Sequence, residues 1–227
     1  MIVHFATSSE EQIDRIARLG AIVSANPYYT VGFADKYAQF GLGPQRADAM
    51  VRSASVLKRR IPLSFHSDLP MGPSAPLNFV WCAVNRITPS GRVAGPEQRI
   101  GVEDALRAVT IESAYSWQKE NELGSICPGK IANLTVLDQD PLTVEPINLK
   151  NIPIWGTMFE GRIFPVSVKA RRPATSAIEP PLAALPAGDD NSDHTHAGDP
   201  CGVARQVARA LMVNWLDRQV LAAREGR

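Results

Sequence analysis

The sequence has no long hydrophobic run and almost no excess of charge of either sign. None of its apolar stretches approaches the about 18 residues that a membrane-spanning helix needs. The 24 basic side chains nearly balance the 23 acidic ones, which argues against charge-driven binding to nucleic acid or to an anionic membrane. The first residues, MIVHFATSSEEQ, lack the charged and apolar regions of a secretory signal.

Cysteine is also scarce. The three cysteines are Cys82, Cys127 and Cys201, and they lie far apart in the sequence. Their odd number and wide spacing match neither a disulfide framework nor a paired metal-binding motif, which indicates a reducing compartment. Because a secretory signal is lacking as well, we expect a cytoplasmic protein.

What the sequence does contain is the apolar content of a folded protein, with 44% hydrophobic residues in 227. Apolar periodicity and turn residues divide the first 68 residues into alternating strands and helices. The expected order is a strand at 2–3, a helix whose capping box runs from Thr7 to Glu10, a strand at 21–25, a looser segment, a helix at about 46–60 and a strand at 62–68. Strands separated by helices predict an α/β fold with a parallel sheet.

Each of these expected strands ends in side chains capable of chemistry. His4 ends the first, Asn26 follows the second, and His66 and Asp68 end the third. The carboxyl ends of parallel strands form the functional edge of many α/β proteins. His66 and Asp68, two positions apart, point to one face of a strand, where an imidazole and a carboxylate can hold a metal or move a proton. The residues alone equally allow buried, hydrogen-bonded histidines without a metal.

The second half of the chain changes character after residue 124. Strongly β-forming stretches at 131–137, 154–159 and 162–164, the last two joined by a turn at Glu160–Gly161, predict a small β module. Residues 171–200 are rich in proline, alanine, glycine and aspartate, which predicts a flexible linker. Residues 201–227 predict an amphipathic helix that docks on its own protein or on a partner subunit.

Several stretches, taken in order, resemble one known family. They are Leu63–Pro70, Pro76–Leu77, Ala83–Arg86, Ala105–Thr110 and Gly124–Pro141. This succession resembles the C-terminal part of the metal-dependent amidohydrolase superfamily, and within it the branch of N-substituted formamide deformylase-like enzymes. The resemblance extends from about Ile2 to Pro165.

The resemblance implies the C-terminal portion of a (β/α)8 TIM-like barrel, with about three βα units, and part of a small β-sandwich. The implied domains are a partial barrel at 1–123, a β-sandwich segment at 124–170, the linker at 171–200 and the C-terminal helix at 201–227. A complete barrel takes about 250 residues. The family's other metal ligands should therefore precede Ile2.

The resemblance also implies a site. His4 and Asp68 correspond to ligands of a divalent metal, which we expect to be Zn²⁺, and Asp68 to the general base. His66, Asn26 and Tyr28 are candidate substrate-binding residues. A second histidine pair, His194 and His196, resembles the family's first metal motif. It follows a polar stretch instead of an apolar strand, so a solvated linker is the favoured interpretation.

The implied function is metal-dependent hydrolysis of a non-peptide C–N bond in a small amide, formamide or cyclic imide, by metal-activated water with Asp68 as the base. The chain alone would be catalytically incomplete and would need a missing N-terminal half, or form a homo-oligomer. Two alternatives stay open. One is a non-catalytic regulatory or assembly protein derived from an amidohydrolase, and the other is a small open α/β domain without a site.

Overall fold

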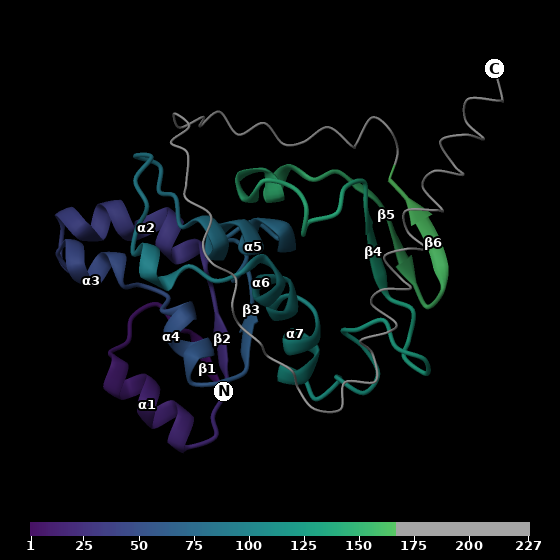
Figure 1. Cartoon of the computed structure of the whole chain (residues 1–227), viewed down its shortest axis with the longest axis horizontal. Helices are drawn as coiled ribbons and strands as arrows, with labels where there is room; N and C mark the ends of the chain where they lie inside the picture. The colour runs from purple at the N-terminus through teal and green to yellow at the C-terminus, as the bar shows by residue number, and fades with distance from the viewer. Residues whose placement is uncertain (167–227) are drawn as a thin grey trace.

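The computed structural model of the chain describes residues 1–166. The expected linker at 171–200, the expected helix at 201–227 and the His194/His196 pair lie outside the described residues. In the part that is described, helices alternate with strands up to residue 116, and two separate sheets are present (Figure 1).

A parallel sheet forms the first half of the fold. Its strands are β1 (Ile2–His4), β2 (Val23–Ala25) and β3 (Leu63–Phe65), paired in that order. All residues of β2 and β3 are buried, whereas those of β1, at the edge of the sheet, are exposed. The predicted parallel arrangement is confirmed. Strands β2 and β3 are shorter than the predicted 21–25 and 62–68, and three residues of each align across the sheet.

Helices follow the strands in sequence and cover the sheet (Figure 1). They are α1 (Glu10–Arg18), α2 (Tyr28–Gln39), α3 (Pro44–Asp48), α4 (Ser53–Lys58), α5 (Pro76–Asn85), α6 (Val102–Ala108) and α7 (Ile111–Ser116), with short 3₁₀ helices η1 (Pro96–Gln98) and η2 (Pro146–Asn151). Of these, α4, α6 and α7 contact β3. The sheet is thereby buried except at β1.

The capping box of α1 lies two residues beyond the predicted position. Ser9, not Thr7, is the N-cap: its hydroxyl accepts a hydrogen bond from the Gln12 amide at 3.3 Å, and the Gln12 side chain accepts one from the Ser9 amide at 2.9 Å. Glu10 is instead free to pair with Arg52 and Arg59, both at less than 3 Å. Ser9 and Gln12 thus make the local cap, and Glu10 forms ion pairs with two distant arginines.

Two helix predictions need correction. The supposedly looser segment after Pro27 holds α2, and the single helix expected at about 46–60 is two helices, α3 and α4. Between them Val51 has a φ of 49°, a left-handed conformation that a β-branched residue adopts only under tertiary constraint.

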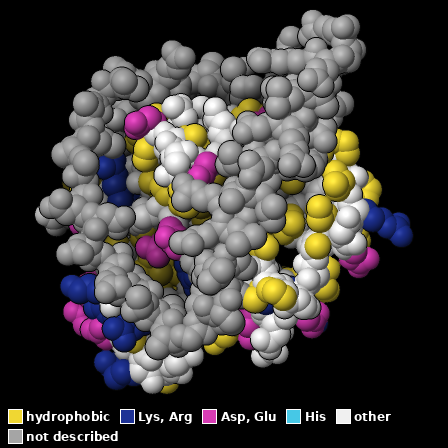
Figure 2. All heavy atoms as spheres, turned by 45° about the vertical axis from the view of Figure 1, so that its right-hand side comes forward, with side chains coloured by type: hydrophobic (Ala, Val, Ile, Leu, Met, Phe, Trp, Pro, Cys, Tyr) yellow, Lys and Arg dark blue, Asp and Glu magenta, His cyan; other side chains and the backbone are white. Residues whose placement is uncertain are grey.

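The predicted β module forms an antiparallel sheet. Its strands are β4 (Leu134–Leu137), β5 (Ile154–Phe159) and β6 (Arg162–Pro165). Glu160 and Gly161 both have positive φ, as a two-residue hairpin between twisted strands requires, so the predicted turn is confirmed. Figure 2 brings this side forward and shows hydrophobic side chains at the surface among charged ones, in keeping with the exposure of Phe159, Ile163 and Phe164.

One hydrophobic core joins the two parts of the described chain. Leu149 and Ile152, from the segment between β4 and β5, lie in the same buried cluster as Val80 of α5. Hydrogen bonds support the packing: the Trp81 indole donates to the Ile147 carbonyl at 2.8 Å, and the Asn85 amide donates to the Pro146 carbonyl at 2.9 Å. Helix α5 is therefore the link between the parallel sheet and the β module.

Among residues 1–166, no helix is both long and apolar enough to cross a membrane. The buried thiol of Cys82 is free, and burial raises its pKa to about 12, so it is unreactive at neutral pH. Cys201 lies outside the described residues.

Candidate active site

The site lies at the carboxyl ends of the three parallel strands. Because His4 pairs in register with Ala25, and Ala25 with Phe65, the residues that follow each strand emerge at the same edge of the sheet. Of the predicted site residues, His4, His66 and Asp68 come together there. His4 Nδ1 lies 3.1 Å from His66 Nε2 and 3.6 Å from Asp68 Oδ2.

His4 and Asp68 face each other from strands that are not neighbours. Their side chains are 48% and 39% exposed, so both remain accessible from solvent. Both residues adopt left-handed backbone conformations, with φ of 68° for His4 and 51° for Asp68. Such conformations cost free energy for residues other than glycine and recur at functional sites. The tertiary structure thus places the side chains of His4 and Asp68 close together, at the cost of two unfavourable backbone conformations.

His66 is held between two partners. Its Nδ1 lies 2.9 Å from the Ser24 hydroxyl, and its Nε2 faces His4. Burial lowers the pKa of His66, the proximity of His4 lowers it further, and Asp68 partly offsets the effect. The ring is therefore neutral at physiological pH. Sequence reasoning offered His66 as a substrate contact, a role that stays a prediction.

We expect His66 to titrate below the ordinary histidine value of 6.5. Because the folded protein disfavours the protonated ring, the free energy of unfolding should decrease as pH falls through 6.5. Urea unfolding at pH 7.5 and 5.5 measures this loss, and His66→Gln should remove the part of the loss due to this residue. An NMR titration midpoint for His66 at or above 6.5 would contradict the prediction.

Tyr29 belongs to the site although the sequence patterns did not single it out. Its hydroxyl donates a hydrogen bond to Asp68 Oδ2 at 3.2 Å, and its ring centroid is 6.3 Å from that of His4. Burial is the main cause that raises the pKa of Tyr29, and Asp68 adds to it, so the phenol stays protonated and remains a donor. The sequence analysis missed Tyr29 because it did not predict α2, the helix on which Tyr29 lies.

Asn26 and Tyr28 were predicted to contact substrate. Asn26 is fully buried; its amide donates to the Ser67 carbonyl at 3.1 Å, and its oxygen accepts from the Tyr28 backbone at 3.1 Å. Tyr28 is half-buried and packs against the core. In this structure Asn26 thus fastens the loop after β3 to the start of α2, and substrate binding by either residue stays a prediction.

The donors at the site suit a divalent metal in kind but not in number. Imidazole nitrogen and carboxylate oxygen are ligands of zinc, and catalytic zinc takes three protein ligands. Within residues 1–166, no group of three or more histidine, cysteine, aspartate or glutamate side chains is arranged to hold a metal ion. His4 and Asp68 therefore amount to part of a ligand set, and the described residues do not form a metal site by themselves.

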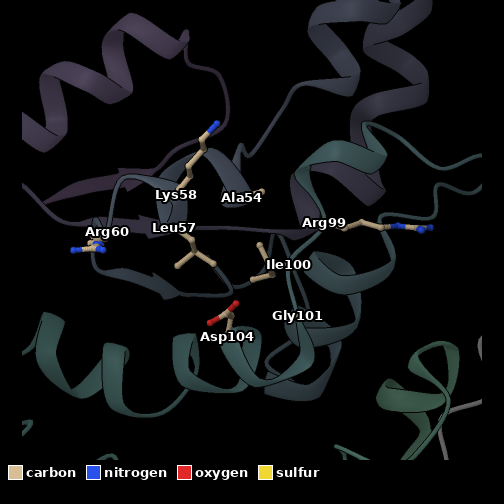
Figure 3. A pocket seen from close by; sticks show the side chains of 8 residues that line it. All are labelled: Ala54, Leu57, Lys58, Arg60, Arg99, Ile100, Gly101 and Asp104. Carbon is tan, nitrogen blue, oxygen red and sulfur yellow. The ribbon is translucent and has the colours of Figure 1, made fainter. Parts of the chain in front are cut away.

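A hollow of about 440 Å³ lies at the opposite end of the sheet (Figure 3). Its lining comes from α4, from the segment just before β3 and from the start of α6. Leu57 and Ile100 face each other across it, whereas Lys58, Arg60 and Arg99 extend away from it. This hollow beside the amino end of β3 is remote from His66 and Asp68, which lie at the carboxyl end.

Comparison with known proteins agrees with this geometry. Residues 1–165 match the amidohydrolase family. The chain belongs to the amidohydrolase family. It is thus a member of an enzyme family, and the resemblance on which the sequence reasoning relied is confirmed.

Among relatives within the amidohydrolase family, the N-substituted formamide deformylase of Arthrobacter pascens is 31% identical over 158 residues, which cover 70% of this chain and 29% of that protein. The putative amidohydrolase YtcJ of Bacillus subtilis is 28% identical over 166 residues, with coverage of 71% and 31%. An uncharacterized metal-dependent hydrolase from Pyrococcus horikoshii has a similar structure, with a TM-score of 0.54 at 27% identity over 64% of this chain and 30% of that one.

The chain spans about three tenths of the length of these relatives. These matches establish an amidohydrolase-type α/β fold and membership of the amidohydrolase family. Because the chain covers so small a part of these relatives, the activity of the whole protein is proposed below from the geometry of the site.

Proposed function

We propose that this chain is the C-terminal part of a metal-dependent amidohydrolase that cleaves a non-peptide C–N bond in a small amide, formamide or cyclic imide. The observation that carries the proposal is the 3.6 Å approach of His4 Nδ1 to Asp68 Oδ2 at the carboxyl edge of the parallel sheet. The similarity to the formamide deformylase supports an N-substituted formamide as the first substrate to test.

The fold supports the proposal that the chain forms part of a (β/α)8 barrel and part of a β-sandwich. Three parallel strands with intervening helices correspond to about three βα units, and both outer strands of this sheet have an edge without a partner strand among the described residues. We propose the domain limits 1–123 for the partial barrel and 124–170 for the sandwich segment. An N-terminal half, or a second copy of the chain, would cover the free edges.

Asp68 is the proposed general base. The hydroxyl of Tyr29 and the ring of His4 both lie near its Oδ2 atom. Asp68 would accept a proton from the attacking water and pass it to the leaving nitrogen as the C–N bond breaks. An amide or formamide then gives a carboxylic acid and an amine, and a cyclic imide gives a ring-opened acid amide. The 39% exposure of its side chain lets water and substrate reach it.

His4 and Asp68 are the residues of this chain that we propose as metal ligands, with zinc as the expected ion. A bound metal of this kind supplies Lewis acidity and lowers the pKa of water. The remaining ligands would come from residues ahead of Ile2. We keep the cytoplasm as the proposed location.

The experiment compares this chain alone with a chain lengthened by the residues encoded in frame upstream. Both are loaded with Zn²⁺, Mn²⁺ or Co²⁺, and their metal content is measured. Release of the amine or ammonia is followed from N-substituted formamides and simple amides, and ring opening to the acid amide is followed from cyclic imides. We expect substoichiometric metal and no turnover from the chain alone, and metal-dependent turnover from the lengthened protein.

Two results would count against the proposal. Tight stoichiometric metal and robust hydrolysis by the chain alone would overturn its incompleteness. A lengthened protein that carries His-x-His after an apolar strand, binds metal and yet hydrolyses none of these substrates would overturn the reaction class.

A non-catalytic assembly role is the second candidate, and the incomplete ligand set among the described residues favours it. Upstream DNA without an in-frame His-x-His motif would support this role. So would a stable complex between the chain and a separate N-terminal half.

A further inference from the structure

A row of aromatic side chains begins at Asp68 and runs along helix α2. The Tyr29 hydroxyl donates to Asp68 Oδ2 at 3.2 Å. The ring centroids of Tyr29 and Phe33 are 6.0 Å apart, and those of Phe33 and Tyr37 are 5.9 Å apart. The three residues are spaced four positions apart in α2, so they lie along one face of the helix. We call Tyr29, Phe33 and Tyr37 the aromatic row.

The aromatic row leads from the site to the surface. Tyr29 and Phe33 are half-buried and pack partly against the hydrophobic core, whereas Tyr37 is 39% exposed. Eight residues at a rise of 1.5 Å separate Tyr29 from Tyr37, so the row is about 12 Å long. Core packing accounts for the buried sides of the first two rings but not for the continuation of the row to the exposed ring of Tyr37.

The loop that follows Asp68 adds further apolar surface. Leu69 is 68% exposed and Met71 is 41% exposed. The Met71 amide donates to the Asp68 carbonyl at 2.6 Å, so the loop turns back toward Asp68. Apolar side chains therefore approach Asp68 both from α2 and from its own loop, and an apolar group bound there would be removed from water.

We propose that the aromatic row binds an aromatic or long apolar substituent on the substrate nitrogen, with Phe33 and Tyr37 as residues that determine specificity. The reacting carbonyl would lie at Asp68, where the row begins, and the substituent would extend along α2. A formamide carries its variable group on nitrogen, and aromatic rings pair favourably at centroid distances of about 4.5–7 Å. The position of the reacting bond rests on the proposed function, whereas binding to the row does not require turnover.

The first test is binding to the full chain without metal, in the presence of EDTA. The phenylalanine and tyrosine rings are labelled with ¹³C, and the protein is titrated with N-(4-phenylbutyl)formamide or N-methylformamide. Phe33→Leu and Tyr37→Ala identify the two ring signals. We expect the phenylbutyl compound to shift both signals and to bind at least about ten-fold more tightly than the methyl compound. Unshifted signals for both rings would overturn the inference.

Tyr37→Ala tests the row at its exposed end, where a substitution should not impair folding. The Kd for N-(4-phenylbutyl)formamide should rise by about 3- to 10-fold, as expected for loss of one aromatic contact. Tyr115→Ala is the matched control, because Tyr115 is also a half-exposed helical tyrosine but lies on α7, outside the row. The control should leave this Kd unchanged. An unchanged Kd in Tyr37→Ala, or an equal rise in both variants, would refute the role of Tyr37.

The lengthened, metal-loaded protein separates this inference from the proposed function. Tyr37→Ala should lower the ratio of kcat/KM for the phenylbutyl compound to that for the methyl compound by the same about 3- to 10-fold. If the lengthened protein hydrolyses neither compound but the ring shifts persist, the reaction fails and the binding surface stands. If the upstream residues abolish the ring shifts, the row is a contact within the protein and the inference fails.

Discussion

Asp68→Asn should lower kcat of the lengthened, metal-loaded enzyme by about 10²- to 10⁴-fold, the range that a general base contributes. Asparagine has nearly the same shape as aspartate but cannot accept the proton from water. The Tyr29 hydroxyl can still donate to the side-chain oxygen, so the local structure should persist. Steady-state kinetics at saturating metal, with metal content measured for each preparation, gives the comparison.

The matched control is Asp14→Asn. Asp14 is also an aspartate with a half-exposed side chain, but it lies on α1, where it pairs with Arg59. The Asp14→Asn substitution should leave kcat unchanged. An Asp68→Asn enzyme that retains its metal and near-normal kcat would rule out Asp68 as the base.

Arg86→Met should destabilise the fold by about 4 kcal/mol, among the largest effects expected of a single substitution. The Arg86 side chain is 1% exposed and donates hydrogen bonds to four backbone carbonyls. These belong to Asp48, Met50, Val51 and Ala94, at distances of 2.6 to 3.0 Å. Methionine would fill much of the space but supply no donor. The Met50 and Val51 carbonyls would keep hydrogen bonds from Thr30 and Ser53, whereas those of Asp48 and Ala94 would lose the donor that Arg86 provides.

Urea unfolding followed by circular dichroism measures this loss. Burial lowers the pKa of Arg86 to about 10, so the guanidinium stays charged at neutral pH. Arg46→Met is the control, because Arg46 is exposed and, among residues 1–166, donates only to the Leu42 carbonyl. It should cost less than about 0.5 kcal/mol. Equal losses for the two variants would show that the buried carbonyls do not depend on Arg86.

Arg86 also explains why one helix prediction was wrong. Apolar spacing at 46–60 favours a continuous helix, and no local residue signals the break at Val51. The carbonyls that the break leaves without helical partners are satisfied by Arg86, 35 positions away along the chain from Val51. A sequence pattern read over a short window cannot identify a hydrogen-bond donor so far away along the chain.

The same distinction applies to the site. His4, His66 and Asp68 could be found because polar residues at the ends of parallel strands meet at one edge, and strand order follows from the alternation of strands and helices. Ser24 lies inside a buried strand, and Tyr29 lies on a helix that the glycine-rich sequence concealed. Their roles depend on side-chain directions that strand and helix patterns do not specify.

The order of the strands, the parallel sheet and the β module follow from the sequence by itself, because periodicity and turn chemistry are local properties. The family follows from the sequence as well, through the resemblance of its motifs. Only the tertiary structure decided where the helices break. It also decided that the Tyr29 hydroxyl contacts Asp68 and that the Ser24 hydroxyl contacts His66. Those outcomes depend on buried polar groups that must find partners, and the partners are brought near only when the whole chain packs.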